Sequence, residues 1–463
     1  MMNGLIEQLA LLLYGRLLIA LLLASGVYFT LKTRLVQLRL LPDAIRRLFD
    51  RPEHGGVSSL GAVMVSTAAR VGTGNIVGVS TAICLGGCGA VFWMVAAAFF
   101  GAALAFAEST LAQLYKMPDG AGGFTGGPAY YIRAAFGAER LSRIFCVSML
   151  VTYGIGFNML TAFNLQSSFS GYGFYDEAVT PAVIGVVVAA ASLLCLLGGR
   201  RRIVSLAETL VPVMGGLYVL VSLIVVLRHT GLVGLTVRCI MSEAFDLRAA
   251  FSGFSGSCIM YGVRRGLFSN EAGVGSAPNA AAAADVSHPV KQGLAQMVSV
   301  LIDTLICMST AAMCLCSGVS PSPELSGMPY VVSALRANFG PAGELFASFA
   351  MLLFAFTTIL GNFFYTDSCL GYLLTAGQLR IVLPVSRMVF CFAVSIGACL
   401  SAGLVWDTAD ICMGVMCLIN LPSLFVLRRD LSRCLRDYTE QRRLGLDPFF
   451  RSALPGWREK SRV

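Results

Sequence analysis

Charged residues are scarce in this sequence. Only 13% of its 463 residues are charged, compared with about 25% in soluble domains, and 56% are apolar. A chain with so little charge cannot cover the surface of a water-soluble protein of this length. The apolar residues also gather in runs near or beyond the ~20 residues that cross a bilayer, for example at 90–114, 203–227 and 294–316. The composition therefore predicts an integral membrane protein surrounded by lipid.

Residues that bind metals or carry out catalysis are few. Histidine occurs three times, and the 15 cysteines include no C-x-x-C pair. Most of the cysteines lie within apolar runs, where they are typical small membrane residues rather than disulfide or zinc ligands. The sequence also has no phosphate-binding loop and no nucleophile elbow. We therefore expect neither an enzyme nor a bound cofactor, and a membrane-embedded sensor or enzyme is only a distant alternative.

The net charge of +9 is distributed unevenly along the chain. Most of the 34 Lys and Arg residues lie in alternate loops, at 32–51, 116–143, 200–202, 264–291, 372–387 and 428–463. Basic loops face the cytoplasm, so we expect the N-terminus outside and the basic tail inside. The positive charge is thus a topology signal and does not predict a nucleic-acid partner. The expected location is the bacterial cytoplasmic membrane.

Hydropathy predicts an all-α protein with eleven transmembrane helices. The predicted spans are about 12–31, 58–85, 89–113, 143–166, 181–198, 203–227, 248–268, 290–316, 342–373, 381–402 and 407–427. Glycine and polar residues interrupt the second and the seventh span, which are five spans apart. This spacing predicts two inverted five-helix repeats, at 58–228 and 248–427. Residues 1–57 then form a peripheral helix with a basic loop, and residues 428–463 form a basic tail.

The two interruptions are candidate substrate-binding segments. An unwound membrane helix exposes N–H and C=O groups, which is tolerated only around a cavity. Such N–H groups bind a carboxylate and such carbonyls bind an ammonium or a cation, so the pair suits a zwitterion. The candidates are Gly72, Thr73, Gly74, Asn75, Gly253, Phe254, Ser255 and Gly256. The alternative is close helix packing, since Gly74 and Gly78 form a small-x-x-x-small pattern.

Ionisable residues within the spans are a second group of candidates. Arg70, Glu108 and Asp303 are expensive to bury, and each is either functional or part of an ion pair that joins helices. Arg70 needs an anionic partner, and the sequence leaves Asp303 and Glu108 as alternatives. The adjacent hydroxyls of Thr357 and Thr358 either bond to their own helix or complete a site for a hard cation.

Nine sequence segments resemble one family, the alanine or glycine:cation symporters, which share the inverted-repeat fold of the leucine transporter. The clearest are ARVGTGNIVGV at 69–79, GGPAYYI at 126–132, RGLFSNEAGVGSAPNAAAA at 265–283, FAFTTILG at 354–361 and WDTADICMGVMCLIN at 406–420. The resemblance runs from about residue 37 to residue 449. It implies sodium-coupled symport of a small neutral amino acid, such as alanine, glycine or D-alanine, by alternating access.

The resemblance also implies roles for particular residues. It places sodium between the carbonyls of Ala68, Val71 and Phe354 and the hydroxyls of Thr357 and Thr358. It implies that Asn270 and Glu271 position a helix or form a gate. Thr161 stands where the family usually has a glutamine facing the substrate, so the cargo is less certain than transport itself. Another small zwitterion or proton coupling is the alternative, and the sequence does not determine the oligomeric state.

Overall fold

The computed structural model describes residues 17–52, 56–119, 122–245 and 258–452. The chain is almost entirely helical in these ranges. The helices of its first half are α2 (Leu18–Lys32), α3 (Val36–Arg39), α4 (Leu41–Arg47), α5 (Ser59–Arg70), η2 (Gly74–Gly78), α6 (Val79–Gly86), α7 (Ala90–Leu114), α8 (Pro128–Phe136), α9 (Glu139–Met149), η3 (Leu150–Gly156), α10 (Phe157–Ser167), α11 (Thr180–Leu196) and α12 (Gly199–Arg228). A short antiparallel hairpin, β1 (Met117–Pro118) and β2 (Phe124–Thr125), forms in the glycine-rich loop after α7.

The second half continues the helical pattern. Its helices are α13 (Thr230–Ala244), α15 (Cys258–Asn270), α16 (Pro278–Ala283), α17 (Pro289–Leu315), η5 (Pro323–Leu325), α18 (Met328–Phe339), α19 (Pro341–Leu373), α20 (Ala376–Gly397), α21 (Ala402–Val426) and α22 (Arg428–Arg443). Many begin at a residue whose side chain accepts a hydrogen bond from one of the first N–H groups of the helix, or at a proline, which has no N–H group. Ser58 accepts a hydrogen bond from Gly61 N before α5, and Pro289 and Pro341 open α17 and α19.

Several helices are long and apolar enough to cross a membrane. Among the described residues there are seven, namely α7, the continuous stretch α9–η3–α10, α12, α17, α19, α20 and α21. The pair Ser59–Arg70 and Gly74–Gly86 is bent by 52° at a short break and adds an eighth candidate, while α2 and α11 are shorter apolar helices. The prediction of an all-helical membrane protein is confirmed. The number of eleven crossings and the inverted repeat remain predictions.

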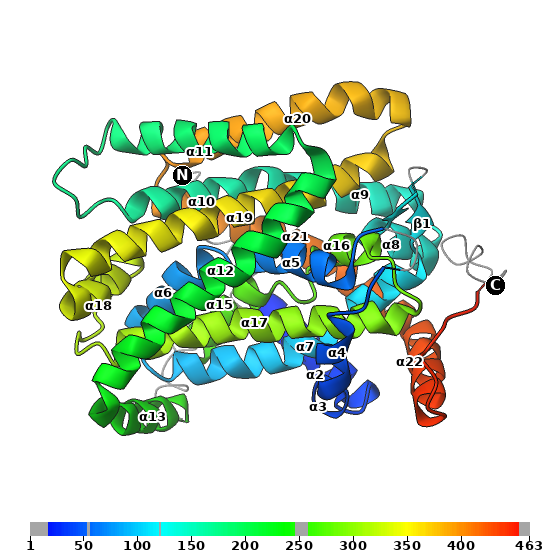
Figure 1. The fold of residues 1–463 in the computed structure, drawn as a ribbon, viewed down its shortest axis with the longest axis horizontal. Helices are drawn as coiled ribbons and strands as arrows, with labels where there is room; N and C mark the ends of the chain where they lie inside the picture. The colour runs from blue at the N-terminus through cyan, green and yellow to red at the C-terminus, as the bar shows by residue number, and fades with distance from the viewer. Residues whose placement is uncertain (1–16, 53–55, 120–121, 246–257, 453–463) are drawn as a thin grey trace.

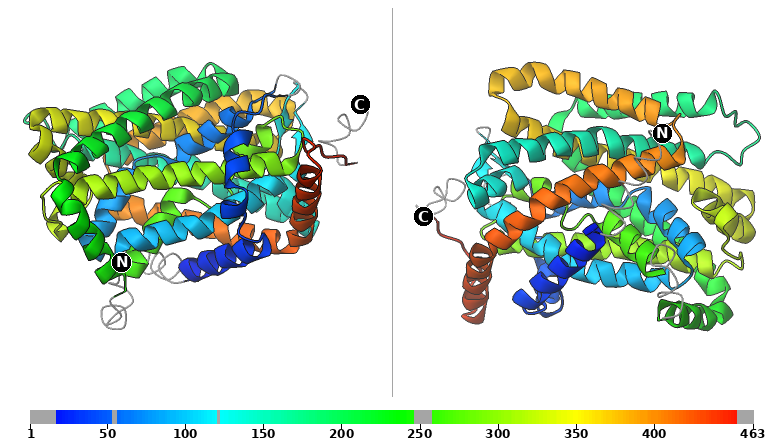
Figure 2. Two further views of the ribbon diagram at one scale, coloured as in Figure 1. Left: turned by 60° about the horizontal axis from the view of Figure 1, so that its bottom comes forward. Right: turned by 180° about the vertical axis from the view of Figure 1, so that it is seen from behind.

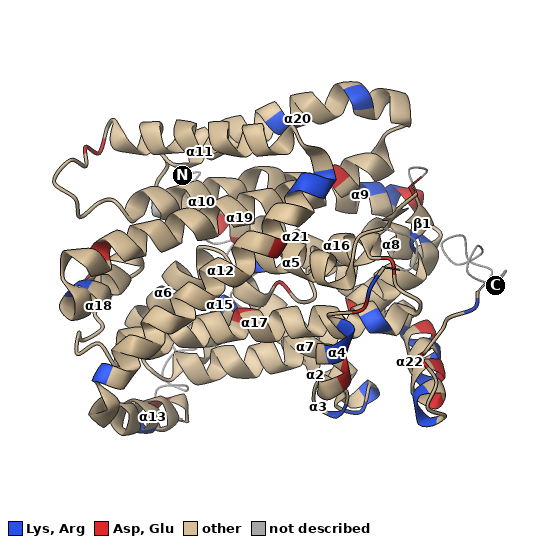
Figure 3. Cartoon of the chain, in the orientation of Figure 1, with Lys and Arg blue, Asp and Glu red and all other residues tan. Residues whose placement is uncertain are grey.

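The long helices lie side by side, with their axes roughly along one direction (Figure 1). α7 packs against both α15 and α17, and α11 packs on α20 at one side of the bundle. Figure 2 shows α2 at the edge of the bundle, where it contacts α7. We call the end with α4, α8 and α22 the basic end, because most Lys and Arg residues gather there (Figure 3). The opposite end, with α13 and α18, is the α13 end.

One charge assignment made from the sequence is wrong. Arg264 and Arg265 were expected in a basic loop, but the structure places both within α15, where each is less than 10% exposed. The basic loop at this point therefore reduces to Lys291, at the start of α17. The predicted span 248–268 already included both residues, so only their assignment to the loop was wrong.

Candidate functional site

The second predicted span is interrupted at the expected place. α5 ends at Arg70, and Val71 leaves helical geometry with φ −76° and ψ 78°. Gly72 N then donates to the side-chain oxygen of Asn75 at 3.0 Å, which closes a tight turn before helical structure resumes at Gly74. An asparagine side chain thus replaces a main-chain acceptor that the broken helix has lost.

Asn75 also links the break to a buried carboxylate. Its Nδ2 donates to Asp303 Oδ1 at 2.6 Å, and Ser269 Oγ of α15 donates to both oxygens of Asp303, at 3.0 and 2.9 Å. Asp303 lies on α17 and is 1% exposed. It therefore joins the interrupted span and α15, which continues the second predicted break. Ser269 had not been singled out from the sequence.

Arg70 has neither of its expected partners. It is 2% exposed, and its Nη1 donates a short hydrogen bond to Ser299 Oγ. Among the described residues Arg70 forms no ion pair, and its Nε and Nη2 have no hydrogen-bond partner. A buried guanidinium with unused donors is expensive unless an anion joins it.

A small cavity opens at the break. Its lining is formed by Ala69, Arg70, Gly72, Thr73, Gly74, Phe157, Leu160, Thr161, Phe268, Ser269, Glu271 and Thr358. Thr161 faces this cavity, as its alignment with the family's glutamine implied. The hydroxyl of Thr73 accepts a hydrogen bond from Asn164 Nδ2 at 3.0 Å, which ties the break to α10. Asn75 is turned toward Asp303 and does not line the cavity.

Glu271 supplies a carboxyl group to the same cavity. It follows the end of α15 with a left-handed backbone, φ 48°, and its Oε2 accepts from Ser276 Oγ at 2.6 Å. Its neighbour Asn270 points elsewhere: Asn270 Oδ1 accepts from Ala272 N, and its amide packs against Gly101 of α7. Glu271 thus belongs to the cavity, whereas Asn270 shapes the chain after α15.

The residues expected around sodium divide into two groups. Thr358 Oγ1 points at the break and donates to Ala68 O at 3.3 Å, with Gly72 packed against the same hydroxyl. Thr357 faces away, toward Met214 of α12, and its hydroxyl bonds to the carbonyls of Leu353 and Phe354. Val71 is buried at the end of α5. Ala68 and Thr358 therefore meet, and Thr357 follows the alternative of bonding to its own helix.

Glu108 lies between the cavity and the basic end. It is fully buried on α7, and its Oε1 accepts a short hydrogen bond from Asn420 Nδ2 of α21. Asn420 also donates to Gly273 O and accepts from Tyr131 at 2.6 Å. The ion pair considered for Glu108 is absent among the described residues, and a hydrogen-bonded network joins the helices there instead.

Aromatic side chains cover the cavity toward the α13 end. Phe157 stacks on Phe268 with ring centroids 5.0 Å apart, and Phe268 meets Trp406 at 5.2 Å. The guanidinium of Arg265 lies 4.0 Å from the Trp406 ring centre, within cation–π distance. These residues were not predicted individually, although Phe268 and Trp406 lie in segments that carried the resemblance. The sequence feature that could have identified them is an aromatic or basic residue within a run of small residues.

A buried ion pair lies beside this aromatic cover. Arg264 Nε donates to Asp410 Oδ2 at 3.1 Å, and a second guanidinium nitrogen contacts the same oxygen. Asp410 is fully buried on α21. The pair joins α15 to α21.

Four of the predicted substrate-binding residues lie outside the described residues. These are Gly253, Phe254, Ser255 and Gly256. Several of the other candidates lie together: Arg70, Gly72, Thr73, Gly74, Thr161, Glu271 and Thr358 line one cavity, and Asn75 bonds to Asp303 next to it.

Comparisons with known proteins identify the family of the chain. A sequence profile of the "Sodium:alanine symporter family" matches residues 1–452. The chain is 39% identical to the "Probable sodium/glutamine symporter GlnT" of Bacillus subtilis, over 95% of this chain and 91% of that protein. It is 39% identical to the "Amino-acid carrier protein AlsT" of the same bacterium, over 94% and 92%. It is 35% identical to the "Sodium/alanine symporter AgcS" of Methanococcus maripaludis, over 89% and 92%.

Proposed function

Because this chain belongs to the sodium:alanine symporter family, whose members are transporters and not enzymes, we propose that it is a sodium-coupled symporter of small neutral amino acids. Alanine and glycine are the first candidates, with D-alanine as a third. The names of its relatives include both an alanine and a glutamine symporter, so a larger zwitterion is the specific alternative.

The observation that carries this proposal is a pair of opposite charges that share one cavity without pairing. Arg70 has guanidinium donors without a hydrogen-bond partner among the described residues, and the carboxyl-bearing Glu271 lines the same cavity. A zwitterion presents a carboxylate and an ammonium, and can bridge two such groups. We assign the substrate carboxylate to Arg70 and the turn at 72–75. The ammonium would lie near Glu271 and the segment at 253–256.

We place sodium at the contact between Thr358 and Ala68. Thr358 Oγ1 and the carbonyl of Ala68 are oxygen ligands of the kind that hard cations prefer, and they lie next to the substrate cavity. The carbonyls of Val71 and Phe354 would complete the set. Thr357 joins it only if its hydroxyl turns from Met214. Sodium is cargo in this scheme, and it brings about 2.3 kcal/mol per 100 mV of membrane potential.

The proposed transport cycle is alternating access through an inverted-repeat core of two five-helix halves. In the proposed topology of eleven spans, the basic end faces the cytoplasm and the α13 end faces outward. Phe268, Trp406 and the pair Arg264–Asp410 would form the outer gate. The network of Glu108 and Asn420 would form part of the inner gate. Asp303 would transmit substrate binding from one broken helix to the other.

The test is uptake by proteoliposomes that contain the purified chain. Radiolabelled L-alanine, D-alanine, glycine and L-glutamine are each supplied with an inward sodium gradient, with an inward proton gradient, or with neither. We expect sodium-dependent uptake of at least one small amino acid, and a clear rise in its half-saturating sodium concentration in Thr358→Ala. Thr408→Ala is the matched control, because this hydroxyl of α21 bonds to its own helix at Leu404 O. Uptake of glutamine alone would show that the proposed small amino acids are not the substrate. Uptake driven by a proton gradient would show that sodium is not the coupling ion.

A further inference from the structure

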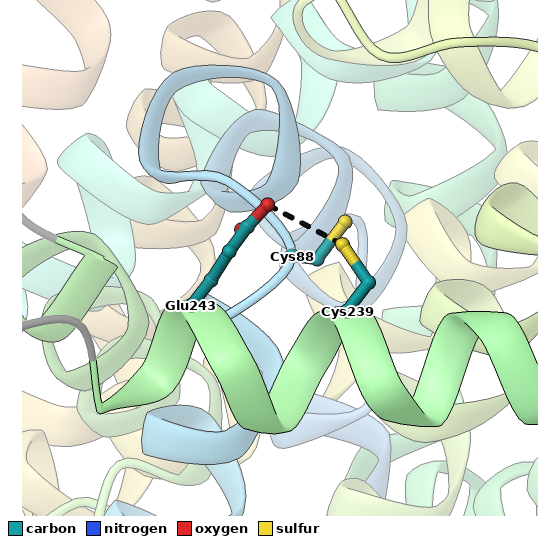
Figure 4. A group of neighbouring side chains, drawn as sticks. All are labelled: Cys88, Cys239 and Glu243. Atoms are coloured by element: carbon teal, nitrogen blue, oxygen red, sulfur yellow. Dashed lines mark hydrogen bonds between the residues drawn. The ribbon is translucent and has the colours of Figure 1, made fainter.

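A cluster of two thiols and a carboxylate lies at the α13 end, away from the cavity described above. Cys88 comes from the turn between α6 and α7, and Cys239 and Glu243 lie one turn apart on α13 (Figure 4). One ligand atom of each residue lies within 4.8 Å of the other two. The Cys239 thiol donates to Glu243 Oε1 at 3.3 Å. Residues four apart on a helix share a face, so α13 presents its two ligand groups together to Cys88.

The surrounding main chain holds this cluster in place. Gly89 N donates to Glu243 Oε2 at 3.1 Å, which leaves Oε1 directed at the thiols. Gly87 adopts φ 81°, a backbone that favours glycine, and an added Cβ there would lie 2.6 Å from Glu243 Oε2. Trp93 Nε1 of α7 donates to Ala244 O at 3.0 Å and so anchors the end of α13. The three groups are thus oriented before any ligand arrives.

The chemistry of this donor set favours one class of ligand. Two sulfur ligands and one carboxylate oxygen match zinc and related divalent ions, whereas sodium, calcium and magnesium prefer oxygen alone. Three protein ligands leave a fourth position for water, and all three residues are only partly buried. A carboxylate held by a main-chain N–H beside two thiols has the outer-shell support typical of metal ligands.

We propose that Cys88, Cys239 and Glu243 form a binding site for a zinc-class divalent metal ion. Binding replaces the thiol protons with the metal, which joins α13 to the turn between α6 and α7. Since α6 is the second half of the interrupted span, the bound metal restrains that half against α13. The site is separate from the proposed sodium and substrate sites, and its test does not require transport.

The test is zinc binding by the purified full-length chain in detergent. Any polyhistidine tag is removed, the thiols are reduced with a phosphine, and zinc is titrated in competition with a chromogenic chelator. We expect one zinc ion per chain at this site, with affinity at least about tenfold lower in Cys88→Ser, Cys239→Ser and Glu243→Gln, because even outer-shell changes cost 10–100-fold. Cobalt(II) should show a thiolate charge-transfer band that Cys88→Ser and Cys239→Ser each weaken.

Cys399→Ser is the matched control, since Cys399 is an exposed cysteine that follows the end of α20. Its zinc affinity and cobalt spectrum should equal those of the unaltered chain. Equal melting temperatures of all variants without metal show that the cysteine changes leave the fold intact. The proposal is wrong if the reduced chain binds no zinc, or if Cys88→Ser and Cys239→Ser bind it as tightly as Cys399→Ser. A Cys88–Cys239 disulfide whose reduced form binds no zinc would also overturn it.

Discussion

Gly72→Ala tests the proposed cation site most directly. A Cβ at position 72 would lie 2.4 Å from Thr358 Oγ1, closer than real Cβ atoms come to other atoms. The hydroxyl must then turn away from Ala68 O, or the break must shift. Overpacking of this kind costs about 1–3 kcal/mol, which corresponds to a roughly 5- to 150-fold weaker apparent sodium affinity. The same substitution leaves the charge of the cavity unchanged.

The assay is the sodium dependence of initial uptake in proteoliposomes at a fixed amino-acid concentration. Gly78→Ala is the matched control on the same span, because its added Cβ meets its nearest neighbour, Arg265 Cδ, at an ordinary 3.7 Å. A double-mutant cycle adds a second control. In a Thr358→Ala background the clash has no hydroxyl to displace, so Gly72→Ala should change sodium dependence little further.

Three results would refute this reasoning. The first is a Gly72→Ala protein whose half-saturating sodium concentration equals that of the unaltered chain. The second is an equal effect of Gly72→Ala and Gly78→Ala, which would show that any added methyl group on this span disturbs transport. The third is additive effects of Gly72→Ala and Thr358→Ala, which would show that the effect of Gly72→Ala does not depend on the Thr358 hydroxyl.

Three further predictions address the charges around the site. Arg70→Gln should raise the KM for the amino acid about 10- to 150-fold, because hydrogen bonds to charged groups contribute about 1.5–3 kcal/mol. The sodium dependence of uptake should change little. Initial uptake measured across a range of amino-acid and sodium concentrations gives both quantities. Asp410→Asn should lower the melting temperature, because it removes the buried ion pair that joins α15 to α21; a Tm equal to that of the unaltered chain would contradict this. The contact of α22 should weaken in acid: burial lowers the pKa of His288, and the hydrogen bond from His288 lowers the pKa of Asp437. His288 in the unfolded chain therefore binds a proton more tightly than His288 in the folded chain. The stability that the neutral His288 gives to the α22 contact is present above pH about 6.5 and is lost as the pH falls below it. Hydrogen exchange in α22 should rise between pH 7.5 and 5.5, and His288→Gln should remove that pH dependence.

Composition and local pattern predicted much of this molecule. The scarcity of charge and the long apolar runs identify a membrane protein, because a bilayer selects apolar residues at every exposed position of a span. The interruption at 72–75 was also visible, because two glycines, a threonine and an asparagine follow one another in mid-span. Charge bias between loops gave a topology that remains a prediction.

The partners of the buried polar groups were not visible in the sequence. Arg70 was expected to pair with Asp303 or Glu108, yet Asp303 holds Asn75 and Ser269, and Glu108 binds Asn420. Asn75 and Asp303 are 228 positions apart, and only the packing of α17 against the broken span brings them together. A sequence states which charges need partners, but the geometry of packed helices decides which partner is in reach.

The hydroxyl pair at 357–358 shows the same division. The sequence by itself determined that two adjacent hydroxyls lie in an apolar helix, and it left two roles open for them. Successive residues on a helix point about 100° apart, so they can face different neighbours. Only the tertiary structure decided that Thr358 meets Ala68 at the break while Thr357 turns to Met214, because that choice depends on how α19 is rotated between α5 and α12.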